Sequence, residues 1–502
     1  MPPNASVVLR KNTAEMKRFL ADSFVLIAAY FAAFLLRFDF ETPSFGWRAV
    51  CGGVPMMWTL GVGTLWAWGC FRLRSGAVTL RNLPCFAGAV GTMVAVQLLL
   101  RGVFDSPEAV GIRPPISVAL MAGGLSLLGL LSLRYVGRLQ LRPVEVSDLL
   151  GRDEREINAP CVRSALMGKT VLVTGAGGSI GSELVRQVLA ANPEKVLMVD
   201  ISEAALYRLC EQLQEEPSAK NRSVPVVGDC GDRAWIRHLL RRERPDVLLH
   251  AAAYKHVPMM EANPCAALKN NALASRVLAE AAAECGVGTF VLVSTDKAVR
   301  PVSVMGITKR LAEIFVQELA MRGSQTRFCA VRFGNVLDSS GSAVPKFRQQ
   351  IRRGGPVTIT DPRMKRYFMT IPEAAGLVLQ AATLAQGGEI FVLDMGRPVL
   401  IKQLVETMIV RSGLRPGKDI AIVYTGIRPG EKLEESLNLE SETTVKTGHR
   451  KIFINRIPPH CGERVEALLA QCIALAAEED DLSAERLKAL LTEEGYIHDE
   501  NV

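Results

Sequence analysis

The sequence contains no pair of cysteines spaced as Cys-x-x-Cys, and its six histidines show no spacing typical of metal ligands. A zinc site would need such spacings, and a small disulfide framework would need regularly placed cysteines. The eleven cysteines are instead scattered from Cys51 to Cys472. We therefore expect reduced structural thiols and no bound metal.

Four apolar segments in the first third of the chain have no acidic residue in their interior. The nearest acidic residue is Asp22, near the start of the first segment. A helix needs about 20 mostly apolar residues to cross a bilayer. We predict a transmembrane region over residues 1–142, with helices at about 19–37, 49–71, 85–104 and 115–133. No cleavage site follows the first segment, so we expect it to stay as an anchor. The first and third segments are short, and buried core helices remain an alternative for them.

The net charge of +8 does not indicate a nucleic-acid-binding protein, because much of the excess flanks the apolar segments. Ten Lys and Arg residues lie in three places: before the first segment, between the second and third segments, and after the fourth. The other two loops carry four in total. Positively charged loops stay on the cytoplasmic side of a membrane. The pattern predicts four spans with both termini and the remaining chain in the cytoplasm.

A glycine-rich loop, Gly-Ala-Gly-Gly-Ser-Ile-Gly at 175–181, follows a β-branched run at 169–174 and precedes a helical segment. Free backbone N–H groups at the start of a helix bind a pyrophosphate where glycine leaves room for it. The spacing of the glycines is similar to that of short-chain dehydrogenases/reductases and indicates a bound dinucleotide. The expected loop contacts come from Gly175, Gly178, Ser179, Ile180 and Gly181.

Further strands complete the dinucleotide-binding pattern. Asp200 ends the second strand about 20 residues past the loop, where a carboxylate accepts from ribose hydroxyls, and no arginine follows it to bind a 2′-phosphate, so NAD is favoured over NADP. Asp229 ends the third strand, where relatives hold the adenine, and the fourth runs into Ala251 and Ala252 beside the pyrophosphate. Strands alternating with helices predict an α/β, Rossmann-like, doubly wound parallel sheet.

The fifth strand delivers Ser-Thr-Asp-Lys at 294–297 to the carboxyl edge of the sheet, where ligands bind in such folds. Lys309 begins a helix twelve residues past Lys297. Short-chain dehydrogenases carry Tyr-x-x-x-Lys in this helix, one turn apart on one face. Met305 stands here in place of the tyrosine.

Several sequence phrases resemble one family. They are Asp-Leu-Leu-Gly-Arg at 148–152, Ala-Ala-Tyr-Lys-His-Val-Pro at 252–258, Ser-Thr-Asp-Lys at 294–297, Arg-Phe-Gly-Asn-Val-Leu at 332–337 and Arg-Pro-Gly-Glu-Lys at 428–432. From about residue 20 to 455 the chain resembles the membrane-bound nucleoside-diphosphate-sugar 4,6-dehydratases of bacterial polysaccharide and glycoprotein biosynthesis, in their long form with four N-terminal helices. Met305 is also similar to the long-form members.

The resemblance implies a redox-neutral dehydration of UDP-N-acetylglucosamine, with configuration at carbon 5 retained. NAD takes hydride from carbon 4, a base removes the proton from carbon 5, water leaves carbon 6, and hydride returns there. It implies Asp296 as the acid and Lys297 as the base, which requires a protonated carboxyl beside a partly neutral amine. We expect Thr295 to bind the carbon 4 hydroxyl and Lys309 to bind the nicotinamide ribose.

The substrate is expected to contact a second set of residues: Lys255, His256, Asn335, Lys346, Arg363, Arg428 and Lys432. Arginine suits bidentate contact with phosphate. The predicted parts of the chain are the membrane region at 1–142, a cytoplasmic linker at 143–167, an NAD-binding domain at 168–333, an interleaved substrate-binding lobe at 334–460 and a helical extension at 461–502.

The expected partners are a UDP-sugar, the lipid bilayer of the bacterial inner membrane, further copies of the chain and neighbouring glycan-assembly enzymes, and no nucleic acid. Two alternatives stay open. One is a sugar-nucleotide epimerase, which shares this fold and cofactor. The other is a membrane-tethered, NAD-binding scaffold that has lost catalysis together with the tyrosine at position 305.

Overall fold

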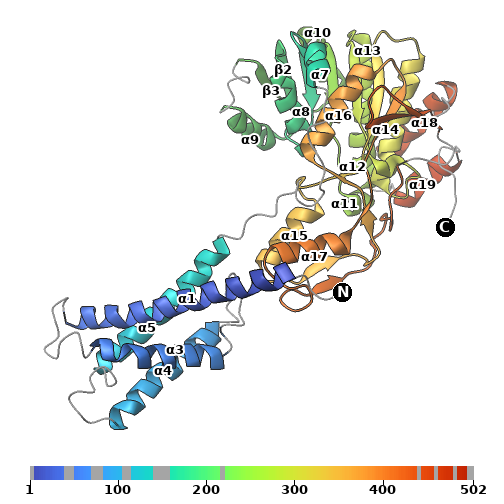
Figure 1. Ribbon diagram of the computed structural model, residues 1–502. Helices are drawn as coiled ribbons and strands as arrows, with labels where there is room; N and C mark the ends of the chain where they lie inside the picture. Colours follow the sequence, from blue (N-terminus) through green and yellow to red (C-terminus); the bar gives the residue numbers. More distant parts are fainter. Residues whose placement is uncertain are drawn as a thin grey trace. The chain divides into compact units, whose positions relative to one another are not determined.

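The computed structural model describes residues 5–38, 50–68, 70, 83–103, 115–139, 159–214, 221–437, 443–456, 462–478 and 483–493. It divides into two compact units, residues 1–143 with 409–419 and residues 144–408 with 420–502 (Figure 1). Most of the predicted linker, and with it the phrase at 148–152, lies outside the described residues. Residues 159–166 form a helix, α7 (Ala159–Leu166), which packs on the core of the second unit.

The first unit contains the helices α1 (Ala5–Arg37), α3 (Val54–Ala67), α4 (Leu83–Val103) and α5 (Ile116–Leu139). Each packs against two others, since α1 contacts α3 and α5, and α4 contacts the same two. Two glycines allow close approach. A Cβ at Gly61 would lie 2.7 Å from Leu26, and one at Gly123 would lie 2.6 Å from Val94. Small residues therefore serve helix packing here.

Three helical segments of this unit are long and apolar enough to cross a membrane: Phe19–Arg37, Val50–Ala67 and Ile116–Leu133. A fourth apolar segment, Pro84–Leu99, is shorter. The count of four spans, the orientation and the cytoplasmic termini stay predictions. Asp22, which the sequence placed at the membrane boundary, lies within the first of these segments and is buried.

The second unit is built on a mostly parallel sheet, as the strand pattern predicted. Its order in the described residues is β14-β15-β11-β6-β5-β4-β1-β2-β3, and β15 pairs antiparallel with both of its neighbours, β11 and β14. The order reverses between β1 and β4, which is where such sheets bind ligands at their carboxyl edge. The strands are β1 (Thr170–Thr174), β2 (Lys195–Asp200), β3 (Ser223–Val227), β4 (Val247–His250), β5 (Thr289–Val293), β6 (Arg327–Arg332), β11 (Glu389–Leu393), β14 (Thr443–Lys446) and β15 (Ile452–Arg456).

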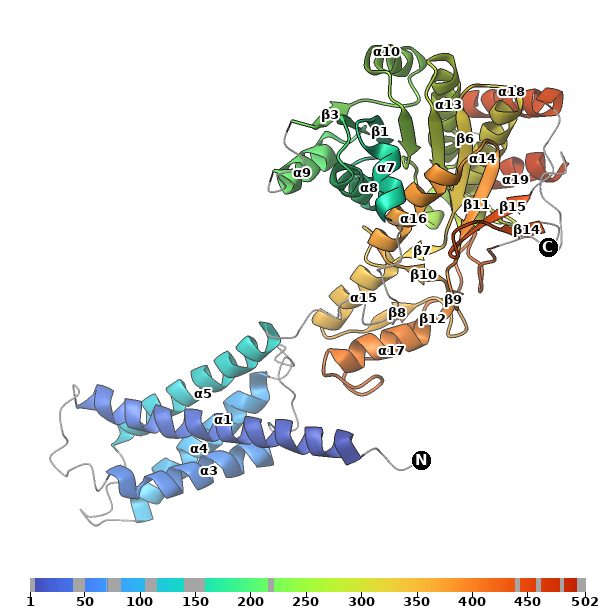
Figure 2. The ribbon, with the colours of Figure 1, turned by 45° about the horizontal axis from the view of Figure 1, so that its top comes forward.

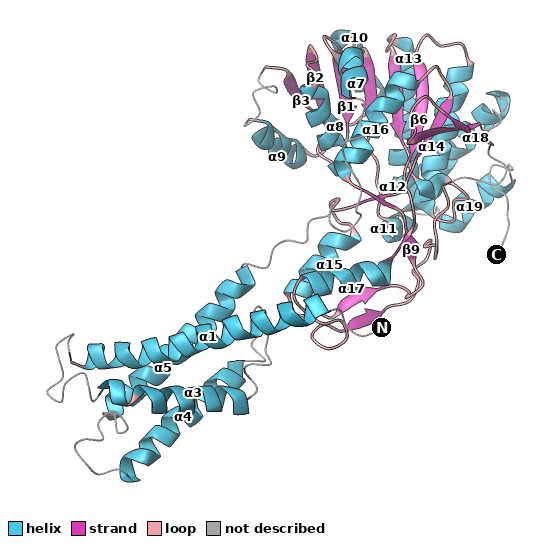
Figure 3. Ribbon diagram, in the orientation of Figure 1, coloured by secondary structure: helices cyan, strands magenta, loops and turns pink. Residues whose placement is uncertain are grey.

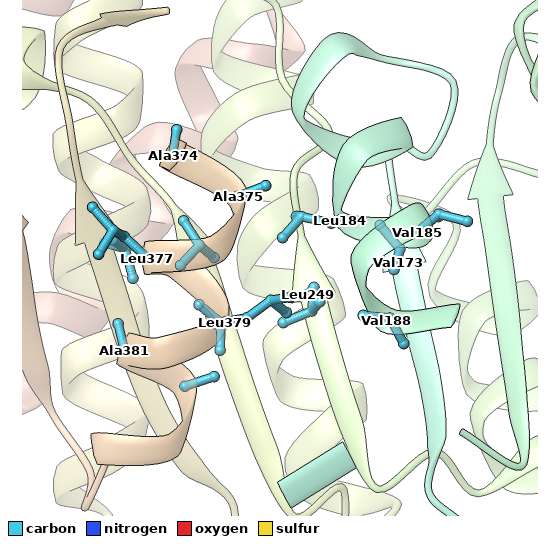
Figure 4. Packing of buried hydrophobic residues seen from close by; sticks show 14 of the residues in the cluster. Val173, Leu184, Val185, Val188, Leu249, Ala374, Ala375, Leu377, Leu379 and Ala381 are labelled. Carbon is cyan, nitrogen blue, oxygen red and sulfur yellow. The ribbon is translucent and has the colours of Figure 1, made fainter. Parts of the chain in front are cut away.

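Helices cover both faces of this sheet (Figure 3). Val171 and Val173 of β1 belong to the cluster on one face, which also contains residues of α8 (Ser179–Ala190) and α16 (Ile371–Leu384). Figure 4 shows Val173 beside side chains of α8. Leu172 points to the other face, towards the cluster formed by α10 (Arg233–Glu243), α13 (Ala274–Glu284) and α14 (Val304–Met321). Because both faces of β1 are covered, all five of its residues are buried and its three central positions are apolar.

The remaining helices connect or flank the sheet. They are α9 (Glu203–Leu213), α11 (Val257–Glu261), α12 (Pro264–Ala267), the π-helical turn η3 (Leu268–Leu273), the 3₁₀ turn η4 (Asp296–Ala298), α15 (Ala343–Arg352), α17 (Ile401–Arg411), α18 (Gly462–Ala477) and α19 (Ala484–Glu493). The predicted C-terminal helical extension thus contains α18 and α19, which pack on α14.

Within the described residues, three two-stranded sheets contain strands that follow β6 in the chain. Figure 2 labels most of these strands. The sheets pair β7 (Asn335–Val336) with β10 (Phe368–Met369), β8 (Val357–Ile359) with β13 (Ile422–Tyr424), and β9 (Lys365–Arg366) with β12 (Val399–Leu400). The first of these sheets carries Asn335, which the sequence assigned to the substrate.

Candidate active site

The glycine-rich loop joins β1 to α8 and closes against the end of β4. Gly175 has a φ of +65°, and a Cβ there would lie 2.6 Å from the backbone nitrogen of Ala252. A Cβ at Gly181 would lie 2.0 Å from the carbonyl oxygen of Gly175, so both positions require glycine. Gly178 is the N-cap of α8 and adds no side chain over the first amides of that helix. The loop therefore forms a cradle in which backbone N–H groups can bind an anion.

Gly181→Ala should lower the affinity for NAD by about 100-fold or more, because the added methyl must displace the loop and about 3 kcal/mol of strain corresponds to about 100-fold. Calorimetric titration of the detergent-solubilised full chain with NAD measures this loss. Gly448→Ala is the matched control, since a Cβ there meets nothing within 4 Å. Equal affinity of the two variants would show that the loop does not hold the dinucleotide.

The two acidic residues predicted to hold the adenosine end lie at the carboxyl edge. Asp200 ends β2, and its carboxylate accepts from the backbone nitrogens of Gly177 and Ser202, each at 2.9 Å. Asp229 follows β3 and accepts from the backbone nitrogen of Gly231 at 2.8 Å. Asp200 thus also anchors the glycine loop to the second strand.

The other predicted loop residues have distinct surroundings. The hydroxyl of Ser179 accepts from the backbone nitrogen of Ser340 at 3.0 Å, which ties the start of α8 to the segment before α15. Ile180 packs against the core, while Ala251 and Ala252 follow β4 and are half-buried. The contact at Ser179 joins the predicted dinucleotide loop to a segment predicted to receive the substrate.

Asp296 and Lys297 form an ion pair at the end of β5, where Thr295 is the N-cap of η4. The Oδ1 atom of Asp296 accepts from the Thr295 hydroxyl and from Lys297 Nζ, both at 2.9 Å. Lys297 Nζ also donates to Asn335 Oδ1 at 3.1 Å. Asp296 is fully buried, and within the described part of the chain its Oδ2 has no hydrogen-bond partner. Four predicted residues are therefore together, with one buried acceptor left open.

Lys297 is a cation in this arrangement. Burial alone would lower the pKa of Lys297, but the charges of Asp296 and Glu435 and the hydrogen bond that Lys297 donates to Asp296 outweigh burial and raise it. The resemblance implied a protonated Asp296 beside a partly neutral Lys297. That form holds the same number of protons as this ion pair. A proton moving along the 2.9 Å hydrogen bond from Nζ to Oδ1 would convert one form into the other.

Helix α14 places Met305 and Lys309 one turn apart, on the same side of the helix. Its N-cap is Ser303, whose hydroxyl accepts from the backbone nitrogen of Gly306 at 3.1 Å. Met305 and Lys309 are both buried. Burial lowers the pKa of Lys309 to about 8, against the opposing charge of Glu313. Lys309 is therefore a buried cation at neutral pH that loses its charge in mildly alkaline solution.

A buried charge network lies behind the strand-end motif. Glu313 of α14 accepts from Arg332 Nε and Nη2, both at 2.8 Å, and from the Ser294 hydroxyl at 2.6 Å. Arg310 adds a hydrogen bond at 3.1 Å. Burial alone would raise the pKa of Glu313, but the two arginines and the Ser294 hydrogen bond lower it to about 2. This network joins the end of β5, which leads into Thr295 to Lys297, to β6 and to α14, which carries Met305 and Lys309.

Three of the predicted substrate residues lie around the pair or its neighbouring loops. Lys432 donates to the carbonyl oxygens of Val299 and Arg300 at 3.0 and 2.6 Å, and its pKa is lowered by burial. Lys255 and His256 follow β4. Burial lowers the pKa of both, and the charge of Lys255 lowers that of His256 further.

The other three predicted substrate residues have separate positions. Lys346 is exposed on α15. Arg363 forms a two-point ion pair with Asp361, and Arg428 pairs with Glu431. Within the described residues, none of the three forms a hydrogen bond to the Asp296–Lys297 pair. Their assignment to the substrate stays a prediction.

The sequence did not single out Glu435, which lies beyond the Arg-Pro-Gly-Glu-Lys phrase. Glu435 is 5% exposed, and its Oε2 has no hydrogen-bond partner within the described residues. Its charge acts on Lys297. Arg366 of β9 positions this loop, because its guanidinium donates to the carbonyl oxygens of Lys432 and Leu433.

Comparison with known proteins shows the family of the chain. A family described as "Polysaccharide biosynthesis protein" matches residues 171–457, more than half of the chain. The chain belongs to this family. Its match begins within β1 and ends just after β15, so it contains the glycine loop, the Asp296–Lys297 pair and Glu435.

Curated relatives and solved structures are similar to parts of the chain. The capsular polysaccharide biosynthesis protein CapD of Staphylococcus aureus is 47% identical over 333 residues, which are 66% of this chain and 55% of CapD. The chain spans about half the length of the curated relatives it matches first. Among solved structures, Pen from Bacillus thuringiensis is 29% identical with a TM-score of 0.54, over 61% of this chain and 99% of Pen. DesIV of Streptomyces venezuelae, a dTDP-glucose 4,6-dehydratase solved with NAD and TYD bound, is 21% identical with a TM-score of 0.49, over 66% of this chain and 99% of DesIV.

Proposed function

We propose that this family member is an NAD-dependent sugar-nucleotide 4,6-dehydratase. Its substrate is UDP-N-acetylglucosamine, and its product is the UDP-2-acetamido-2,6-dideoxy-4-keto-hexose used for a bacterial surface polysaccharide or glycoprotein glycan. The observation that carries the proposal is the buried Asp296–Lys297 ion pair with one open carboxylate oxygen, at the edge of the sheet that also holds the glycine loop. The name of the relative CapD supports the class of pathway.

The residues at the switch point fit NAD. Gly175 and Gly181 leave room where a side chain would collide with backbone, and α8 presents its amides there. Asp200 is available for the adenosine ribose and Lys309 for the nicotinamide ribose. Bound there, NAD would supply a reversible hydride acceptor.

The ion pair has the protons that an elimination needs. With carbon 4 as a ketone, Lys297 Nζ takes the carbon 5 proton as the C–H bond breaks, and Asp296 gives its proton to the leaving carbon 6 hydroxyl. A double bond forms between carbons 5 and 6, and the pair returns to its charged form. The hydride taken from carbon 4 would then return to carbon 6 while Lys297 returns the proton to carbon 5, and the proton released from the carbon 4 hydroxyl restores the shared proton of the pair.

Two further residues support this chemistry. The hydroxyl of Thr295 donates to Asp296, and its oxygen can accept a hydrogen bond from the carbon 4 hydroxyl of the sugar. Thr295 would thus bind the hydroxyl that a tyrosine binds in other short-chain dehydrogenases. Met305 itself adds no ionisable group beside Lys309 on this side of α14, and it is buried. Proton transfer is therefore assigned to the Asp296–Lys297 pair.

The test is the mass and labelling of the product. The full chain, extracted with detergent from the membrane fraction in which we expect it, should convert UDP-N-acetylglucosamine without added reductant to a product lighter by one water. In heavy water the product should carry deuterium at carbon 5. A product of unchanged mass would identify an epimerase instead, and no product from any UDP- or dTDP-sugar would refute the proposal.

A further inference from the structure

The strongest observation outside the predicted catalytic set is the burial of a second carboxylate at the Asp296–Lys297 pair. Glu435 is 5% exposed and Asp296 is fully buried. Each has one oxygen, Oε2 and Oδ2, that is buried without a hydrogen-bond partner in the residues that the structure describes. A buried carboxylate oxygen without a donor is costly and calls for an explanation.

Arg366 does not neutralise Glu435 closely. Its Nη2 lies 3.9 Å from Glu435 Oε1, which is longer than a hydrogen bond. The same guanidinium donates to the carbonyl oxygens of Lys365, Lys432 and Leu433 at 2.7 to 3.1 Å. Arg366 therefore mainly holds the loop in place, and the negative charge of Glu435 remains to act on Lys297.

Other charges around the Lys297 ammonium are few. Asp296 contacts it, Asn335 accepts from it, and Glu435 and Arg366 act on it through space. Lys432 lies near enough for its own pKa to respond to Glu435, Asp296 and Lys297, and its ammonium donates to the carbonyl oxygens of Val299 and Arg300. The charges of two carboxylates, Asp296 in direct contact and Glu435 through space, thus act on the Lys297 ammonium.

We propose that Glu435 is a positioning residue for proton transfer. Its negative charge keeps the Asp296–Lys297 pair in the state that holds one shared proton over the working pH range. The inference rests on the proposed function of that pair. This role explains why Glu435 is buried with an open oxygen. A full ion pair between Glu435 and Arg366 would cancel the negative charge that acts on Lys297. The open Oε2 also remains available to a donor group of the sugar.

The consequence is a defined pH profile. Activity falls in acid when the pair gains a second proton, and in alkali when it loses its only one. A nearby negative charge raises both of these apparent pKa values, since it favours protonation. Removing that charge should move the whole bell-shaped profile of kcat towards lower pH by about one to three pH units, as a charge within several Å does.

The experiment compares Glu435→Gln with Glu435→Asp in the full chain, measured by product formation from pH 5 to 10. Glu435→Gln keeps the shape of the side chain and loses its charge, so its profile should move to lower pH. Glu435→Asp keeps the charge, so its profile should stay within about half a pH unit even if kcat falls. A purely structural role would lower kcat without moving the profile, and that result would overturn the proposal.

Failure of the proposed function is distinguishable from failure of this inference. If the parent chain forms no dehydrated product, the pair can be titrated directly by NMR with [ε-¹³C]lysine, with the Lys297 signal assigned through Lys297→Arg. Glu435→Gln should then lower the pKa of Lys297. An unchanged pKa would refute the inference whatever reaction the protein catalyses.

Discussion

Asp296→Asn and Lys297→Ala are each expected to lower kcat for dehydration by about 1,000-fold, because general acid–base catalysis contributes about 100- to 10,000-fold. The two groups share one proton across a 2.9 Å hydrogen bond, so losing either removes the function of both. The double variant should therefore be about as slow as each single variant. Product formation by the full chain, with NAD affinity measured in parallel, gives the comparison.

Lys402→Ala is the matched control, since Lys402 is an exposed lysine of α17 about 4.0 Å from Glu406 and outside the candidate site. It should retain parental kcat. NAD affinity should stay within about threefold of the parent in all variants, because the glycine cradle is unchanged. If the double variant kept parental kcat, the pair would not be catalytic. A scaffold would keep its cellular role after both substitutions, whereas an enzyme would not.

The sheet and its motifs could be predicted because they depend on local patterns. The second strand, expected to end at Asp200, is observed as Lys195–Asp200, and the glycine loop lies between β1 and α8 as its spacing indicated. Asp296 and Lys297 also follow from sequence, since they come directly after an apolar strand whose carboxyl end must lie at the ligand edge.

Contacts between distant segments could not be predicted in the same way. Glu435 is buried because Arg366 binds carbonyl oxygens 66 and 67 residues further along the chain, and no local pattern reports that contact. Conversely, Arg363 was assigned to the substrate by charge alone. It forms an ion pair with Asp361, two residues away, and charge does not reveal which anion a surface arginine binds.

Glu313 is another residue whose role depends on tertiary structure. Its position in α14 suggests an ordinary helix glutamate, yet it is fully buried between β5 and β6. The network fixes the end of β5 through Ser294, which directly precedes the candidate catalytic residues. Its charge also opposes the effect of burial on Lys309. Stability and catalytic geometry therefore depend on the same carboxylate.

Glu313→Gln should lower the free energy of unfolding at pH 7 by about 3 to 5 kcal/mol, because removing one partner of a buried ion pair leaves the other charge uncompensated. The pKa of Glu313 is lowered to about 2 in the folded protein from an ordinary value of 4.5. The stabilisation from its ionised form is thus complete above pH 4.5 and is lost as pH falls towards 2. The parent should lose stability through this window more steeply than the variant, as denaturant unfolding of the full chain in detergent can measure.

Two controls separate this buried pairing from a general effect of losing a carboxylate. Glu406→Gln, at an exposed ion pair of α17, should change the free energy of unfolding by less than about 1 kcal/mol. Glu313→Leu combined with Arg332→Met removes both charges and should cost less than Glu313→Gln alone, since no strong charge of that pair is then left buried. If Glu313→Gln matched the exposed control at pH 7, the buried network would not stabilise the ends of β5 and β6. The positions of Ser294 and Asp296 would then have to depend on the backbone hydrogen bonds of these strands alone.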